Sequence, residues 1–118
     1  MARKVLIVDD ASVDLQALER IVASSGCMTL TAASGQQAIE RACNEAPDLI
    51  LMDVNMPGMD GFAATRKLKA DARTKDIPVV FVTGKNQKAD MAWGQMLGAR
   101  GYIAKPYTRE QIVAQLAL

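Results

Sequence analysis

Short apolar runs alternate with longer amphipathic stretches along the whole sequence. The runs are strand-sized and cover residues 5–8, 29–32, 49–52, 78–82 and 102–104. In the stretches between them, apolar residues recur every three or four positions, the spacing that places them on one buried face of a helix. The pattern therefore predicts strict alternation of strands and helices, as five β-α units.

Capping residues and glycines mark where the helices begin and end. The predicted helices cover about residues 15–25, 34–44, 62–69, 86–97 and 108–116. The first is expected to end before Gly26, because glycine commonly terminates helices. Ser34 and Gln37 have the spacing of a capping box, in which each side chain binds a free backbone N–H of the first turn. Thr108 and Gln111 predict a second box at the last helix.

Alternating strands and helices imply an α/β fold, with a doubly wound parallel sheet, right-handed crossovers and helices on both faces. The run at residues 49–52 is apolar throughout, as a central parallel strand should be. At 118 residues the chain fits one domain, and it contains no repeat, low-complexity segment or linker. We expect a single domain over residues 1–118, with no room for a second.

Composition narrows the possible functions. Half of the residues are hydrophobic and 23% are charged, which is a globular balance. The formal net charge of +1 gives no electrostatic argument for a nucleic-acid partner or an anionic membrane surface. The apolar runs are far shorter than the roughly 20 residues that span a bilayer, and residues 5–8 are too short for a signal peptide. We expect a cytoplasmic protein without membrane insertion.

The chain has no histidine and only two cysteines, Cys27 and Cys43. The absence of histidine excludes Ser-His-Asp and Cys-His catalysis and a phosphohistidine carrier, so any histidine chemistry must come from a partner. A zinc site would need more ligands than two distant cysteines. Free cytosolic thiols are favoured over a disulfide.

Polar side chains stand where the predicted strands end. The residues that follow or close four of the strands are Asp9, Asp10, Asp53, Thr83 and Lys105. In a parallel sheet these ends share one edge, where ligands bind in open α/β folds. Each residue alone has an ordinary explanation as a cap, a turn former or a solvated charge. All five at one edge instead indicate a functional site.

Three carboxylates at one place repel one another unless a cation neutralises them. An acidic pocket lined by oxygens suits Mg²⁺ (or Mn²⁺), which keeps several waters and takes carboxylate and phosphate oxygens. One carboxylate can then attack phosphorus as a nucleophile. Lys105 and Thr83 are suited to hold the charge on the transferring phosphoryl oxygens.

The sequence resembles the receiver domains of two-component response regulators over essentially its full length. The resemblance rests on Asp9-Asp10, the segment 53–61 (DVNMPGMDG), Thr83-Gly84 and Lys105-Pro106. It implies the flavodoxin-like or CheY-like sheet with strand order 2-1-3-4-5. It also makes this a CheY-type single-domain regulator, a receiver without an output domain.

The resemblance assigns roles to the residues at the site. Asp53 would be the phosphoacceptor and Asp10 a direct Mg²⁺ ligand. Asp9 would contact the metal only through water or would support its direct ligands, and Asn55 would bind the metal through its backbone carbonyl. The phosphodonor would be a histidine kinase or a small acyl phosphate, so the protein would catalyse only its own phosphorylation and dephosphorylation.

A switch is also implied by the family. Thr83 would move toward the phosphoryl group and Tyr102 would repack inward. The surface that changes would comprise residues 88–97, 100–104 and 108–116, and would control a protein effector not named by the sequence. We also expect a cis Lys105-Pro106 bond and a monomer.

Within the family, residues 92–100, 61–66 and 77–80 are similar to the PilH-type regulators of type IV pilus twitching motility. This similarity implies a role in pilus-driven or chemotaxis-like motility. Trp93 in this stretch is equally well explained as a packing residue or as an anchor for a partner. Ala11 and Gly101 depart from residue types common in the family. These departures bear on how the receiver is tuned and not on whether it can be phosphorylated.

Two other functions compete with the effector-coupled switch. The first is a phosphate sink, with an intact acidic site but no effector of its own. The second is a Mg²⁺-dependent phosphatase with an aspartyl nucleophile. Such phosphatases usually place a second aspartate two residues after the nucleophile as the general acid, and here Asn55 stands there, which argues against an enzyme.

Overall fold

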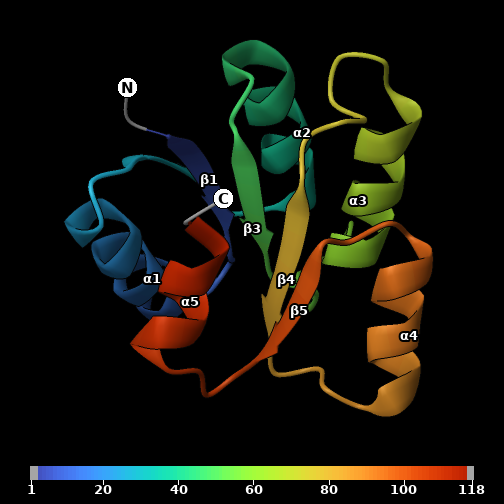
Figure 1. The fold of residues 1–118 in the computed structure, drawn as a ribbon. Coiled ribbons are helices and arrows are strands. Elements are labelled where there is room, and N and C mark those ends of the chain that lie inside the picture. The colour runs from blue at the N-terminus through green and yellow to red at the C-terminus, as the bar shows by residue number, and fades with distance from the viewer. Residues whose placement is uncertain (1–2, 117–118) are drawn as a thin grey trace.

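A parallel sheet runs through the middle of the molecule, between two layers of helices (Figure 1). The computed structural model describes residues 3–116. The strands are β1 (Lys4–Val8), β2 (Met28–Ala32), β3 (Leu49–Met52), β4 (Val79–Thr83) and β5 (Gly101–Ala104). They pair in the order β2-β1-β3-β4-β5, all parallel, which confirms the predicted fold and strand order.

The helices divide between the two faces of the sheet (Figure 1). They are α1 (Ser12–Ser24), α2 (Gly35–Glu45), α3 (Gly61–Ala70), α4 (Lys88–Met96) and α5 (Arg109–Leu116). Successive strand residues point to opposite faces, so the central strands feed two separate cores. Val5 and Ile7 pack with residues of α1 and α5, whereas Leu6 and Val8 pack with residues of α2 and α3. The carboxyl ends of the strands emerge between these layers.

Several of the predicted boundaries shift by a few residues, and two of these shifts illustrate the local cause. The helix predicted from residue 86 begins at Lys88, after Gln87, whose backbone N–H binds the Asp90 carboxylate at 3.1 Å. The fourth strand begins at Val79 rather than at Pro78, although the Pro78 carbonyl still accepts a hydrogen bond from the Ile50 N–H. Both shifts fall at element ends, where local hydrogen bonds decide the first residue.

The predicted capping boxes are confirmed in one case and altered in the other. At α5, Thr108 and Gln111 bind each other's backbone N–H groups. At α2, the Ser34 hydroxyl accepts the Gln37 N–H at 3.1 Å as expected, but the Gln37 side chain binds the N–H of Ala33 instead of Ser34. The cap therefore extends one residue further back than the sequence pattern predicts.

The remaining structural expectations concern thiols and membranes. Cys27 and Cys43 are free, as predicted. Among residues 3–116, no helix is both long and apolar enough to cross a membrane.

Candidate functional site

The carboxyl ends of β1 and β3 bring the predicted acidic residues together. Asp9 and Asp10 follow β1, and Asp53 follows β3, its neighbour in the sheet. Each of the three offers a carboxylate oxygen, and these oxygens all lie within 4.8 Å of one another. Asp9 and Asp53 are buried, whereas Asp10 is exposed. The sheet-edge argument from the sequence is confirmed for these carboxylates.

Asp53 presents its two carboxylate oxygens to different partners. Its Oδ1 accepts the backbone N–H groups of Val54 at 2.7 Å and Asn55 at 3.3 Å. Its Oδ2 lies 3.5 Å from the Lys105 ammonium. The backbone therefore fixes the side chain through Oδ1. Among the described hydrogen bonds, Oδ2 has Lys105 as its one partner.

The loop after Asp53 turns back sharply, and Gly61 makes this possible. The Gly61 N–H binds the Val54 carbonyl at 2.9 Å, which places the start of α3 against the backbone that directly follows Asp53. A Cβ atom at Gly61 would lie 2.1 Å from the Asp53 carbonyl oxygen. Asp60 caps the helix by accepting the Ala63 N–H at 2.8 Å. This end of the sheet is therefore closely packed at backbone level.

Lys105 enters the same cluster from the end of β5 and precedes Pro106 through a cis peptide bond, as predicted. Its ammonium lies 2.8 Å from Asp9 Oδ2 and 3.1 Å from Asp14 Oδ2. The sequence reasoning missed Asp14. The available signal was its position four residues after Asp10 and directly before the stretch predicted to be helical.

Burial and pairing set the protonation of this cluster. Burial raises the pKa of the Asp9 carboxyl, although hydrogen bonds from Lys105 and the Ala11 N–H act in the opposite direction. Burial alone would lower the pKa of Lys105, but its hydrogen bonds to Asp9 and Asp14 and the charge of Asp53 raise it. Lys105 therefore stays charged, whereas burial disfavours the charged form of Asp9.

The donor set fits a hard divalent cation. Three carboxylate oxygens converge, no nitrogen or sulfur ligand belongs to the group, and one of its members is exposed to solvent. Burial, with a smaller contribution from the charge of Asp53, raises the pKa of the Asp9 carboxyl, so a nearby cation would favour its charged form. Oxygen ligands with room for water are what Mg²⁺ prefers. The residues present can hold such an ion.

Thr83 and Tyr102 meet through the backbone of one residue, Lys85. The fully buried Thr83 hydroxyl accepts the Lys85 N–H at 3.2 Å, and the Tyr102 hydroxyl donates to the Lys85 carbonyl. The Tyr102 ring packs against Phe81, with 5.7 Å between ring centroids. Thr83 also joins the site, because its carbonyl accepts the Lys105 N–H at 2.9 Å. This link between the two predicted switch residues was not foreseen.

Tyr102 is only half-buried, yet its hydroxyl remains protonated over a wide pH range. Burial, followed by the charges of Asp90 and Asp53, raises the pKa of Tyr102 to about 12. The phenol can therefore act as a hydrogen-bond donor to Lys85 throughout the physiological range.

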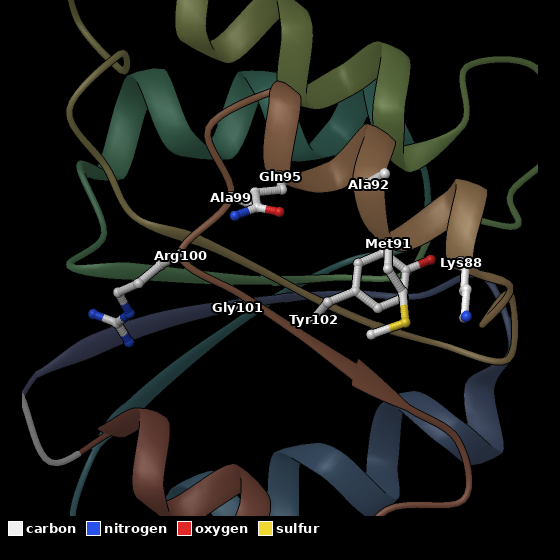
Figure 2. Close-up of a pocket in the computed structure, with 8 residues that line it drawn as sticks. All are labelled: Lys88, Met91, Ala92, Gln95, Ala99, Arg100, Gly101 and Tyr102. Carbon is white, nitrogen blue, oxygen red and sulfur yellow. The ribbon is translucent and has the colours of Figure 1, made fainter.

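A hollow of about 530 Å³ lies between α4 and β5, and Tyr102 forms part of its lining (Figure 2). Its lining includes Lys88, Met91 and Gln95 from α4, and Tyr102 from β5. Most of the lining lies within residues 88–97 and 100–104, part of the surface that the family resemblance expects to change on phosphorylation.

Trp93 lies elsewhere on α4, 38% exposed. The Arg66 guanidinium of α3 lies 5.6 Å from the centre of its ring, so the indole packs at least in part against its neighbours.

Known proteins match the chain over nearly its whole length. The family model described as the response regulator receiver domain matches residues 5–117. Protein PilH of Pseudomonas aeruginosa is 43% identical over 113 residues, covering 96% of this chain and 93% of PilH. The response regulator PleD of Caulobacter vibrioides is 37% identical and covers 98% of this chain, which spans only 26% of PleD.

Solved structures agree with the sequence comparison. The chemotaxis protein CheY4 of Vibrio cholerae is 30% identical and superimposes with a TM-score of 0.91, over 98% of this chain and 97% of CheY4. The receiver domain of sensor histidine kinase PA1611 from Pseudomonas aeruginosa PAO1 is 29% identical, with a TM-score of 0.90 over 98% of this chain and 95% of that domain. It is described with a magnesium ion coordinated in its active-site cleft.

Family match, relatives, fold and clustered carboxylates all agree. The chain belongs to the response regulator receiver domains, the signalling switches of two-component systems.

Proposed function

We propose that Asp53 accepts a phosphoryl group from a histidine kinase and that this modification switches the protein between two states. One observation carries the proposal. Two backbone N–H groups hold Asp53 Oδ1, while Oδ2 lies 3.5 Å from the Lys105 ammonium in a buried acidic cluster. A carboxylate that is fixed through one oxygen and has its other oxygen beside a cation is well placed to act as a nucleophile on phosphorus.

The transfer exchanges one bond to phosphorus for another. A carboxylate oxygen of Asp53 forms a bond to phosphorus as the bond from phosphorus to the donor's histidine nitrogen, or to the oxygen of an acyl phosphate, breaks with its electron pair. Lys105 balances charge on the phosphoryl oxygens, and the Thr83 hydroxyl can bind one of them once it gives up the Lys85 N–H. The same residues act in the later hydrolysis of the aspartyl phosphate.

We assign the metal to the carboxylate cluster. Asp10 and Asp53 would bind it directly, and Asn55 would bind it through its backbone carbonyl. Asp9 would contact it through water or would support the direct ligands. Bound there, Mg²⁺ would supply the positive charge that lets three carboxylates and a phosphoryl group share one site. The exposed side chain of Asp10 leaves the entry open.

The change of state passes from Thr83 to Tyr102 through Lys85, because both hydroxyls bind the backbone of that residue. Movement of Thr83 toward the phosphoryl group removes an acceptor from the Lys85 N–H and so displaces the backbone that Tyr102 binds. Tyr102 lines the hollow between α4 and β5, which forms part of the surface offered to a protein effector together with α5 (Figure 2).

Similarity to PilH over almost its full length supports a role in type IV pilus twitching motility or a chemotaxis-like pathway. A phosphate sink remains the alternative. A pull-down with and without beryllofluoride separates the two, since an effector that binds only the beryllofluoride form eliminates the sink.

Acetyl phosphate with Mg²⁺ tests the chemistry directly. We expect the intact mass to increase by one phosphoryl group, and borohydride reduction followed by peptide mapping to locate it at Asp53. A modification at another residue contradicts the assignment. Steady multiple turnovers of p-nitrophenyl phosphate would instead indicate a phosphatase.

A further inference from the structure

We infer that Asp14 is a positioning residue, which holds Lys105 in the unmodified protein and releases it when a phosphoryl group arrives. The inference rests on the proposed role of Asp53 and adds a regulator to that site. It starts from an ion pair that joins the first turn of α1 to the end of β5.

The Lys105 ammonium has no spare donor in this state. It carries three N–H groups, and it lies 2.8 Å from Asp9, 3.1 Å from Asp14 and 3.5 Å from Asp53. A phosphoryl group on Asp53 brings new oxygens that need this ammonium. The long contact to Asp53 gives way to the phosphoryl oxygens themselves, and a closer approach of Lys105 to these oxygens competes with its contacts to Asp9 and Asp14.

Exposure decides which contact opens. The Asp9 side chain is 4% exposed, and its other oxygen already accepts the Ala11 N–H at 3.0 Å. Losing the lysine would leave a buried carboxylate short of a partner, which is costly. The Asp14 side chain is 50% exposed and can return to water at little cost. The ion pair between Asp14 and Lys105 is therefore the contact that breaks.

This arrangement makes Asp14 a competitor of the phosphoryl group. Without the charge of Asp14, Lys105 no longer has to break this ion pair to reach the phosphoryl group. Phosphorylation should therefore be faster, and the modified form should be more stable. An exposed ion pair accounts for a change of about 2- to 5-fold. The alternative is purely structural, because an acidic residue in the first turn stabilises a helix. That role predicts a lower melting temperature but no effect that depends on Lys105.

The test is a double-mutant cycle with Lys105. Asp14→Asn and Asp14→Glu are each compared with wild type for the rate of labelling by acetyl phosphate at saturating Mg²⁺. Calorimetric titration with beryllofluoride in the presence of Mg²⁺ measures the affinity for a phosphoryl mimic independently. Glu40→Gln, an equal charge change on the exposed side of α2, is the matched control. Asp14→Asn is then repeated in a Lys105→Ala background.

We expect Asp14→Asn to label about 2- to 5-fold faster and to bind beryllofluoride more tightly by a similar factor. Asp14→Glu should behave like wild type, and Glu40→Gln should change neither quantity. In the Lys105→Ala background, the effect of Asp14→Asn on beryllofluoride affinity should vanish. An effect that persists without Lys105, or no effect with Lys105 present, overturns the inference. In both cases wild-type labelling at Asp53 leaves the proposed function intact, whereas its absence removes both.

Discussion

Two clusters of carboxylates and cations stand in different parts of the molecule and have opposite electrostatic character. At the carboxyl ends of the strands, the buried Asp9 and Asp53 share Lys105. Just after α3, Asp71 pairs with Arg73 at 2.8 Å, and both side chains reach solvent. Burial raises the pKa of Asp9, whereas hydrogen bonds from Arg73 lower the pKa of Asp71 to about 2.

The difference shows what burial adds to the same residue types. The pair between Asp71 and Arg73 is satisfied by itself, since each carboxylate oxygen receives a guanidinium N–H. The buried cluster holds more carboxylates than its one ammonium can balance. It gains free energy from an additional cation and places an oriented oxygen beside Lys105. Excess buried charge, rather than the presence of acidic residues, marks the site.

The largest expected effect comes from Asp53→Asn, which removes the oxygen that we propose as the nucleophile of the buried cluster. Labelling by acetyl phosphate should be lost, while circular dichroism shows an intact fold. Asp71→Asn is the matched control, and it should label at the wild-type rate because the exposed pair takes no part in the chemistry. Full labelling of Asp53→Asn would move the nucleophile to another residue.

Steric disruption of the buried cluster should be the next largest effect. Gly61→Ala places a Cβ atom against the Asp53 carbonyl oxygen, and the backbone must shift to accommodate it. We expect a loss of about 3 kcal/mol in the free energy of unfolding, measured by urea denaturation. Gly84→Ala is the control, because nothing lies within 4 Å of a Cβ atom there. Equal stability of the two variants would show that the loop after Asp53 yields freely.

Asp10→Ala tests whether the carboxylates at the strand ends, and not the exposed pair, bind the metal. Asp10 is the exposed member of that cluster, and its removal should weaken Mg²⁺ binding by about 10-fold, as measured by calorimetry. Mg²⁺ should raise the melting temperature of wild type and raise it less for this variant. Asp71→Ala should leave both measurements unchanged, and a loss of Mg²⁺ affinity there would contradict the assignment of the site.

The smallest effect concerns acid stability at the exposed pair. The pKa of Asp71 falls from 3.8 to about 2 on folding, so its ionised form is favoured in the folded state. Its contribution to stability is present above pH 3.8 and is lost as the pH falls toward 2. Asp71→Asn should flatten the pH dependence of the melting temperature in that window. An unchanged acid limb would mean that solvent screens the pair.

Residues at strand ends were the part of the site that the sequence predicted well. Asp9 and Asp53 each follow an apolar run, and the topology of a parallel sheet brings such ends together without knowledge of any side-chain contact. The same reasoning placed Lys105 but not Asp14, because Asp14 sits inside a helix and its contact depends on how α1 meets the end of β5. Helical spacing predicts the face of the helix on which a side chain lies, but not its distance to a side chain on another element.

Details decided by a single hydrogen bond were also out of reach. The capping pattern at Ser34 was correct in kind, yet the Gln37 side chain bonds to Ala33. Thr83 and Tyr102 were both named, but their common attachment to the Lys85 backbone depends on the path of the loop after β4. Local propensities differ too little in energy to fix such choices from sequence alone.

By itself the sequence determined the alternation of strands and helices, the single sheet and the edge where polar residues gather. These follow from hydrophobic periodicity and chain connectivity, which act along the chain and are large in free energy. Only the tertiary structure decided which carboxylate is buried, which reaches water and which of them contact Lys105. Those properties depend on the dielectric surroundings of each group, and burial is a property of the packed molecule rather than of any segment.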